Sequence, residues 1–248
     1  MAINLNCIIN LKKKIMKISN NFKAISKTFI AAVILSVALS ACSKDNNSPQ
    51  QVTGLAIIHT SPGTQPLDFI VDNTKANSKL FSYNTKIDYL DLFPGNRLLS
   101  IVKKDSTEFL VSERFDLSPG KAYSIFVVDT LSKKKLLLIE DDLTTPDAGK
   151  AKVRFIHLSP DALALDLSIN GKETDLFTNK LFKEYTTFAM IDPGASVTFN
   201  IKDNITKAVA ATVPNVKIEQ GKIYTIWAKG LKSKTDSTKF GANIYTHK

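Results

Sequence analysis

Cysteine is nearly absent from this chain. Its 248 residues include two, Cys7 and Cys42, and none follows Cys42. The roughly 200 residues beyond Cys42 therefore cannot form disulfides with one another. Burial of an apolar core has to stabilise whatever these residues form. Their number is sufficient for two ordinary domains.

Histidine is also scarce, which limits metal chemistry. His59, His157 and His247 show no H-x-x-x-H spacing, and no free thiol is available to complete a zinc site. The acidic run Glu140-Asp141-Asp142 lacks the alternation of a calcium loop. We expect this run to be a solvated strand end, with a weak calcium site left open. Because glycine-rich phosphate loops and nucleotide fingerprints are missing too, we expect no cofactor and no metal.

A strong excess of one charge is absent once the N-terminal segment is set apart. Six of the 33 basic side chains and none of the 23 acidic ones precede Cys42, so 27 basic and 23 acidic side chains remain, a formal charge of +4. The one basic run, Lys133-Lys134-Lys135, lies between two apolar segments, as a solvated turn would. We therefore expect no nucleic-acid partner.

Residues 1–41 have the features of a secretory signal peptide. Lysines precede an apolar run from Thr28 to Ala41. That run has 14 residues, whereas a membrane-spanning helix needs about 20. A basic region, a short apolar region and small residues before the break are typical of a cleaved leader. The stretch before Met16 is long for such a leader, so Met16 is an alternative start.

The end of the leader, Leu39-Ser40-Ala41-Cys42, resembles the lipobox of bacterial lipoproteins. The resemblance implies acylation of Cys42, and two acyl chains suffice for stable anchoring. The alternative is an ordinary secreted protein with a cysteine near its cleavage site. Residues 42–51 are then the lipidated cysteine and a flexible polar tether.

The Lys44-Asp45 pair resembles the export signal of Bacteroidetes lipoproteins. We therefore expect a protein that is lipid-anchored in the outer membrane and exposed on the cell surface. The alternative is an anchor that faces the periplasm.

A repeat organises the rest of the chain. IIHTSPGTQPLDFIVDN at 57–73 matches FIHLSPDALALDLSING at 155–171. Two further blocks match in the same order, around Pro94-Gly95 and Pro193-Gly194, and then around Tyr123 and Tyr224. We therefore expect two tandem domains, 52–145 and 150–248. The shared residues of the first block are His59, Ser61, Pro62 and Asp68 in one copy and His157, Ser159, Pro160 and Asp166 in the other.

Each copy is predicted to be a β-sandwich. Short runs alternate apolar and polar residues, as in 67–72 and 165–170, which is typical of half-buried antiparallel strands. The Pro-Gly pairs suit type II turns. Tyr123 and Tyr224 follow a glycine turn and are predicted corner tyrosines, whose hydroxyls bond to the backbone upstream. The expected fold is all-β: two immunoglobulin-like antiparallel sandwiches, each of about seven strands.

These blocks resemble the bacterial domain of unknown function 4397 family. Its members pair a V-R-x-x-H-x-S-P-D start with a later P-G turn and a G-x-x-Y strand, as in VRFIHLSPD at 153–161, Pro193-Gly194 and Gly221 with Tyr224. The first copy departs from the pattern, with Leu55-Ala56 in place of Val-Arg. The resemblance implies extracytoplasmic β-sandwich modules, often on lipoproteins, and supplies no reaction.

The repeated His-x-Ser-Pro motif, with an Asp seven residues after the serine, contains the residue types of a Ser-His-Asp triad. Its serine precedes proline, outside any G-x-S-x-G elbow. We interpret the motif as structural, with the serine capping a turn, the proline ending the strand and the histidine buried. A hydrolase is the least favoured alternative, and we expect no enzyme.

Phe126 and Trp227 stand on the strand face opposite to the one that we expect in the core. Either they fill an interface between the two domains, or they form an aromatic platform for a sugar ring or a partner chain. The function that we expect is a non-catalytic envelope lipoprotein presenting a binding or adhesion surface to a glycan or a protein. The alternative is a structural or accessory subunit of an outer-membrane complex.

Overall fold

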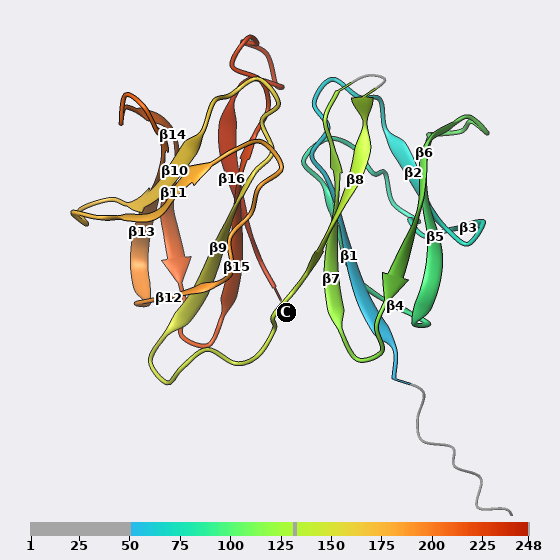
Figure 1. Ribbon diagram of the computed structural model, residues 1–248, viewed down its shortest axis with the longest axis horizontal. Coiled ribbons are helices and arrows are strands. Elements are labelled where there is room, and N and C mark those ends of the chain that lie inside the picture. Colours follow the sequence, from blue (N-terminus) through green and yellow to red (C-terminus); the bar gives the residue numbers. More distant parts are fainter. Residues whose placement is uncertain (1–50, 131–132, 248) are drawn as a thin grey trace, which may run out of the picture. The chain divides into compact units, whose positions relative to one another are not determined.

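The computed structural model describes residues 51–130 and 133–247, and within them the chain is almost entirely β-structure (Figure 1). The predicted leader, the predicted lipidation site Cys42 and all of the predicted tether except Gln51 lie outside the described residues. No helix in the described part is long and apolar enough to cross a membrane. The strands are β1 Thr53–His59, β2 Leu67–Val71, β3 Thr74–Lys75, β4 Lys86–Leu92, β5 Gly95–Lys103, β6 Phe109–Leu117, β7 Ala122–Val128, β8 Lys135–Glu140, β9 Ala151–His157, β10 Leu165–Ile169, β11 Asp175–Lys180, β12 Ala189–Ile191, β13 Gly194–Asp203, β14 Val209–Ile218, β15 Ile223–Lys229 and β16 Gly241–Thr246.

These strands form four sheets that pack as two sandwiches. In the first sandwich, sheet β4-β1-β7-β8 packs on sheet β3-β2-β5-β6 around an apolar core that includes Leu55, Phe69 and Ile125. In the second, sheet β12-β9-β15-β16 packs on sheet β11-β10-β13-β14 around a core that includes Phe155 and Phe199. The two sandwiches have the same strand order, and their strands lie within the ranges predicted for the two domains.

The prediction of two all-β sandwiches is confirmed, with eight strands in each rather than about seven. The sheets are mainly antiparallel, as predicted, with one parallel pairing in each sandwich. Strand β1 pairs with β7 in parallel, and β9 pairs with β15 in parallel. Parallel neighbours need a long connection, and the strands between them, which include the second sheet of each sandwich, supply it.

The two corner tyrosines bond as predicted. The Tyr123 hydroxyl accepts a hydrogen bond from the Ser118 amide at 3.3 Å, and the Tyr224 hydroxyl accepts one from the Glu219 amide at 2.9 Å. Each bond joins the start of a central strand to the backbone five residues upstream. The corner therefore fixes how β7 and β15 enter their sheets.

One of the two predicted type II turns is wrong. Gly95 has φ near +109°, whereas Gly194 has no positive φ and is the first residue of β13. A type II turn needs a positive φ at the glycine. Glycine is required at 194 for a different reason, because a Cβ there would lie 2.7 Å from Val197 Cγ2.

Candidate functional site

A third apolar cluster draws residues from both sandwiches. Phe126 and Trp227 belong to it, at 0% and 2% exposure, together with Ile58 from β1 and Ile156 from β9. The Tyr245 ring packs on the indole with the two centroids 5.7 Å apart. The remaining buried members are Ala56, Val128, Ile139 and Leu158.

An aromatic platform requires ring faces that a ligand can reach. Because Phe126 and Trp227 are buried, the prediction that they form such a platform is wrong for this structure. Their position agrees with the alternative that they fill the space between the two sandwiches.

A closed ring of hydrogen bonds lies at the same boundary. Arg154 Nη2 donates to Asp141 Oδ1 at 2.5 Å, and Arg154 Nε donates to Thr225 Oγ1 at 2.8 Å. The Thr225 hydroxyl lies 2.7 Å from His247 Nε2, and His247 Nδ1 lies 2.7 Å from the Tyr89 hydroxyl. The Tyr89 hydroxyl lies 2.6 Å from Asp141 Oδ2. Tyr89 has one proton to give and the carboxylate can only accept, so the ring closes with His247 protonated at Nδ1.

This ring overturns the expectation for the acidic run. The side chains of Asp141 and Arg154 are 0% and 1% exposed, so Asp141 is a buried counter-ion rather than part of a solvated strand end. Its neighbour Asp142 is exposed and accepts from the buried ammonium of Lys152 at 3.1 Å. Within the described residues, no group of acidic, histidine and cysteine side chains has the arrangement of a metal site.

In the second sandwich, the histidine and serine of the repeated motif form hydrogen bonds with backbone groups. His157 Nε2 donates to the Leu163 carbonyl at 2.9 Å, and its Nδ1 accepts from the Ser159 amide at 3.3 Å. The Ser159 hydroxyl donates to the Gly230 carbonyl at 2.7 Å. Burial lowers the pKa of His157. The hydroxyl and the imidazole thus bond to different backbone groups, and Pro160 lies in the turn that follows.

The first sandwich repeats the serine bond but not the histidine bond. Ser61 Oγ donates to the Asp129 carbonyl at 2.5 Å, and Pro62 is buried beside it. The His59 ring is fully buried and packs on Phe81 with the centroids 5.2 Å apart. Neither of its ring nitrogens has a hydrogen-bond partner among the described residues. Burial lowers the pKa of His59 to about 4, so the ring is neutral at pH 7.

The two motif aspartates bond away from the histidines. Asp68 accepts from Lys75 at 2.8 Å and from the Asn77 side chain at 3.2 Å. Asp166 accepts from Lys207 at 2.7 Å and from the Asn179 amide at 2.7 Å. These residues therefore do not assemble into a triad with the histidine and the serine of their own copy, which agrees with a structural interpretation of the motif.

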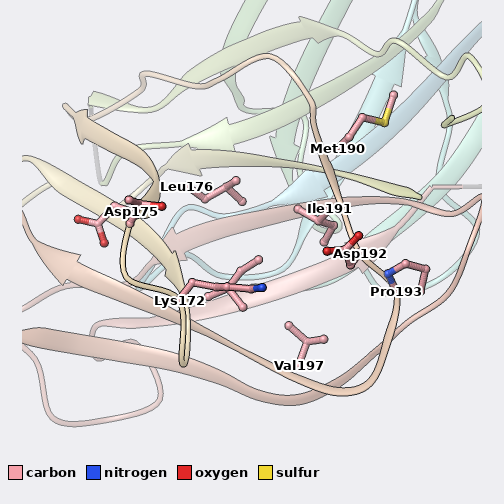
Figure 2. A pocket seen from close by; sticks show the side chains of 10 residues that line it. Lys172, Asp175, Leu176, Met190, Ile191, Asp192, Pro193 and Val197 are labelled. Atoms are coloured by element: carbon pink, nitrogen blue, oxygen red, sulfur yellow. The ribbon is translucent and has the colours of Figure 1, made fainter. Parts of the chain in front are cut away.

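A solvent-open pocket lies at one end of the second sandwich, between its two sheets (Figure 2). Its volume is about 450 Å³, within the range of small-ligand sites. The floor is the end of the second core, because Ile191 is a core residue and Val197 packs against it. Met190 contributes to the lining and is 42% exposed. The other apolar lining residues are Ile169, Leu176 and Pro193.

Thr174 and three charged side chains complete the lining. Asp192 pairs with Lys150 at 2.6 Å, and Asp175 pairs with Lys202 at 2.7 Å. Lys172 has no ion pair within the described part of the chain, and Figure 2 shows it extending from the β10–β11 turn toward the wall that carries Asp192. The charge of Lys172 adds to that of Lys150 in lowering the pKa of Asp192. The pocket therefore combines an aliphatic floor with a mouth where three lysines face two carboxylates.

In the first sandwich, an arginine spans the corresponding place. Arg97 Nε donates to the Phe93 carbonyl at 2.7 Å, and Nη2 donates to the Pro94 carbonyl at 3.1 Å. Arg97 Nη1 pairs with Asp72 at 2.8 Å. The guanidinium thereby ties the turn before β5 to the turn after β2. These are the counterparts of the two turns that form the pocket walls in the second sandwich.

Val197 in the second sandwich occupies the position equivalent to that of Arg97 in the first. Arg97 faces Phe115 two residues before the partner of Gly95, and Val197 faces Val216 two residues before the partner of Gly194. The second sandwich uses three residues rather than two to get there, with a register shift between Gly194 and Val197. The shorter side chain leaves open the space that the guanidinium spans in the first sandwich.

Sequence reasoning missed both the pocket and the hydrogen-bond ring. One signal was present, since the stretch from Pro-Gly to the next core residue is one residue longer in the second copy. The V-R motif gives no role to its arginine, and the structure places this residue, Arg154, in the ring.

The comparisons with known proteins carry little weight on function. No curated protein matches this chain. The crystal structure of a candidate adhesin from Bacteroides ovatus is similar over 76% of this chain and 90% of its own, with 10% sequence identity and a TM-score of 0.17. Such a score supports no argument about fold or activity.

The family comparison agrees with the motif resemblance. The model described as "Domain of unknown function (DUF4397)" matches residues 53–168, a little under half of the chain. The matched range begins with β1 and ends within β10, so it covers the first sandwich and continues into the first two strands of the second. The match supports similarity of this segment to that family, whose description names no reaction.

Proposed function

We propose that this chain is a non-catalytic binding protein of the bacterial cell envelope. In this proposal it consists of two DUF4397-like modules, is anchored by lipid on Cys42 and is exposed at the outer face of the outer membrane. It presents the pocket of the second sandwich to a glycan or a protein partner. The observation that carries the proposal is the contrast between Val197, which leaves that pocket open, and Arg97, which spans its counterpart.

The contrast matters because it is internal to one molecule. If this end of the core were simply hard to fill, it would be open in both sandwiches. In the first sandwich, however, the three nitrogens of the Arg97 guanidinium form hydrogen bonds across it. Leaving Met190 and Val197 accessible in the second costs apolar burial that a residue of arginine length would recover. A ligand that covers the pocket explains why the space stays open.

The hydrogen-bond ring favours a second role, that of a rigid accessory subunit or spacer. A buried ion pair and a shared apolar cluster hold the two sandwiches as one compact unit. In a spacer, the fixed boundary would be the functional feature and the pocket would bind nothing. Closing the pocket by substitution distinguishes the two roles.

The test uses the full chain purified in detergent and a variant whose pocket is closed by the residues of the first sandwich, Val197→Arg with Asn170→Asp. Asn170 is the counterpart of Asp72, because the Asp72 amide donates to Leu98 of β5 and the Asn170 amide donates to Thr198 of β13 at the same rung. The matched control is Val209→Arg, the same change at a half-exposed site of β14 outside the pocket. A glycan array and a library of displayed random octapeptides supply the ligands.

A ligand from either source that binds the wild type and Val209→Arg but not the closed variant supports the proposal. If no ligand is retained, or if the closed variant binds as well as the wild type, the binding function is wrong and the spacer role gains. The location is tested separately by protease treatment of intact cells, with Cys42→Ala as the anchoring control. Domains that survive until the outer membrane is opened would contradict exposure at the surface.

A further inference from the structure

The pocket lining is unsuited to a sugar ring. A sugar surrounds its small apolar faces with hydroxyl groups, and each of these needs a hydrogen-bond partner when it leaves water. Apart from Thr174 and Lys172, the lining supplies aliphatic side chains and no aromatic ring, and its two carboxylates already bind lysines. An aliphatic side chain of a partner is the group that such a floor accommodates without leaving polar groups unpaired.

The positive charge of Lys172 at the pocket mouth favours an acidic residue next to the aliphatic side chain of the partner. Asp192 and Asp175 each form an ion pair with a lysine. Lys172 forms no ion pair among the described residues and acts on Asp192 only at longer range, so one lysine is in excess at the mouth. A partner with an acidic group beside its apolar anchor would complete this set. A pair of this kind at the surface adds little affinity, but it discriminates between acidic and basic neighbours.

The backbone beside the pocket has room for one more strand. Strand β12 is the edge of its sheet and pairs only with β9 in the part of the chain that the structure describes. Its residues Met190 and Ile191 both line the pocket. An extended peptide laid along β12 would bond to the free backbone groups and would place every second side chain toward the space between the sheets. Three residues offer few backbone bonds, so the side chain in the pocket has to contribute much of the affinity.

We propose, as a refinement that rests on the proposed function, that the pocket takes an extended segment of a partner protein with an aliphatic side chain next to an acidic one. The segment adds to the β12 edge, its aliphatic side chain enters the space beside Val197, and its carboxylate pairs with Lys172. The occupant is thus a peptide chain and not a glycan.

The test pans the random octapeptide library against the full chain after counter-selection on Val197→Arg with Asn170→Asp. The expected result is enrichment of peptides in which Leu, Ile or Val adjoins Asp or Glu. Synthetic versions should bind the wild type and Val209→Arg equally, and the closed variant at least tenfold more weakly. Replacing the aliphatic residue of the peptide by serine should also abolish binding.

A charge reversal keeps the test sharp if the closed variant folds poorly. Lys172→Glu changes a turn residue at the pocket mouth, and it should weaken binding of the acidic peptides by about threefold and favour versions with lysine in the acidic position. Enriched peptides without the aliphatic and acidic pair, or peptides that ignore both changes, would overturn the refinement. Glycan binding that is lost in the closed variant, without peptide binding, would overturn it while leaving the proposed binding function intact.

Discussion

Arg97 and Val197 occupy the same rung of equivalent strand pairs, and the difference between them decides whether a side chain spans that end of the sandwich. In each copy, the residue on the partner strand that faces Arg97 or Val197 lies two positions before the residue that faces the glycine of the Pro-Gly turn. In the first copy, the side chain bonds to the walls on both sides. In the second, an extra residue after Gly194 brings a valine to that rung. One arginine thus distinguishes a closed end of a sandwich from a pocket.

Opening the first sandwich is the converse experiment. Arg97→Val with Asp72→Asn removes a partly exposed ion pair and two bonds to carbonyls, so the free energy of unfolding should fall by about 1 kcal/mol. Urea unfolding measures the loss. Lys103→Met is the control, because its pair with Glu108 is exposed on both sides and its removal should cost close to nothing. A loss no larger than that of the control would contradict the bridging role of Arg97.

Breaking the buried ion pair between Arg154 and Asp141 should lower the free energy of unfolding more than opening the first sandwich does. Removing one partner of a buried pair typically costs about 3–5 kcal/mol, because the other charge is left uncompensated. Ser124 and Tyr89 still donate hydrogen bonds to Asp141 when the arginine is removed. Arg154→Met should therefore lower the free energy of unfolding by about 3 kcal/mol, the low end of this range. The double variant Arg154→Met with Asp141→Leu should lose less than Arg154→Met alone.

A double-mutant cycle in urea checks this coupling. The control is Lys121→Met, which breaks an exposed pair with Glu140 and should change the free energy of unfolding by less than about 1 kcal/mol. If Arg154→Met costs no more than Lys121→Met, then the two sandwiches are not joined by the ring of hydrogen bonds.

Trp227 reports on the contact between the sandwiches, since it is the only tryptophan in the chain. Because the indole is 2% exposed, its fluorescence should resist quenching by iodide in the native protein. Trp227→Ala should cost about 3–5 kcal/mol of stability, as truncation of a large buried ring does. Phe93→Ala is the control, because that ring is 62% exposed. Native fluorescence that iodide quenches as fully as that of the unfolded chain would contradict the buried position.

The sequence permitted the fold to be predicted further than the site. Alternation in segments such as 165–170 marks strands whatever their neighbours, and an internal repeat gives the domain plan without any structure. Neither signal reports which side chains meet across a boundary between domains. Asp141 was taken for a solvated acid because its counter-ion, Arg154, comes from the other sandwich.

The pocket was hidden for a related reason. Aligned on Pro-Gly, the sequences place Arg97 against Ser196, and only the register shift before Val197 shows that the valine takes its place. A shift of one residue moves each side chain to the other face of a strand, so a plain alignment misses which residue faces inward.

Acid should destabilise this protein through its histidines. Burial, with the charges of Arg154, Lys86 and Lys152, lowers the pKa of His247 to about 2, and burial lowers that of His59 to about 4. In the unfolded chain both rings titrate near 6.5. Below that pH the unfolded state binds protons that the folded state refuses, so the free energy of unfolding falls as the pH falls from 6.5 toward 4.

The expected loss at pH 5, relative to pH 7, is about 2 kcal/mol for each of these two histidines. Acids do not offset it in this window, because a carboxyl such as Asp142, with its pKa lowered to about 2, is ionised in both states above about pH 5. Urea unfolding at the two pH values measures the change. His247→Gln can still accept from Thr225 and donate to Tyr89, and it should remove the part of the pH dependence that His247 contributes, while the buried His59 and His157 keep theirs. Equal stability of the wild type at pH 5 and pH 7 would show that the ring does not hold His247 neutral.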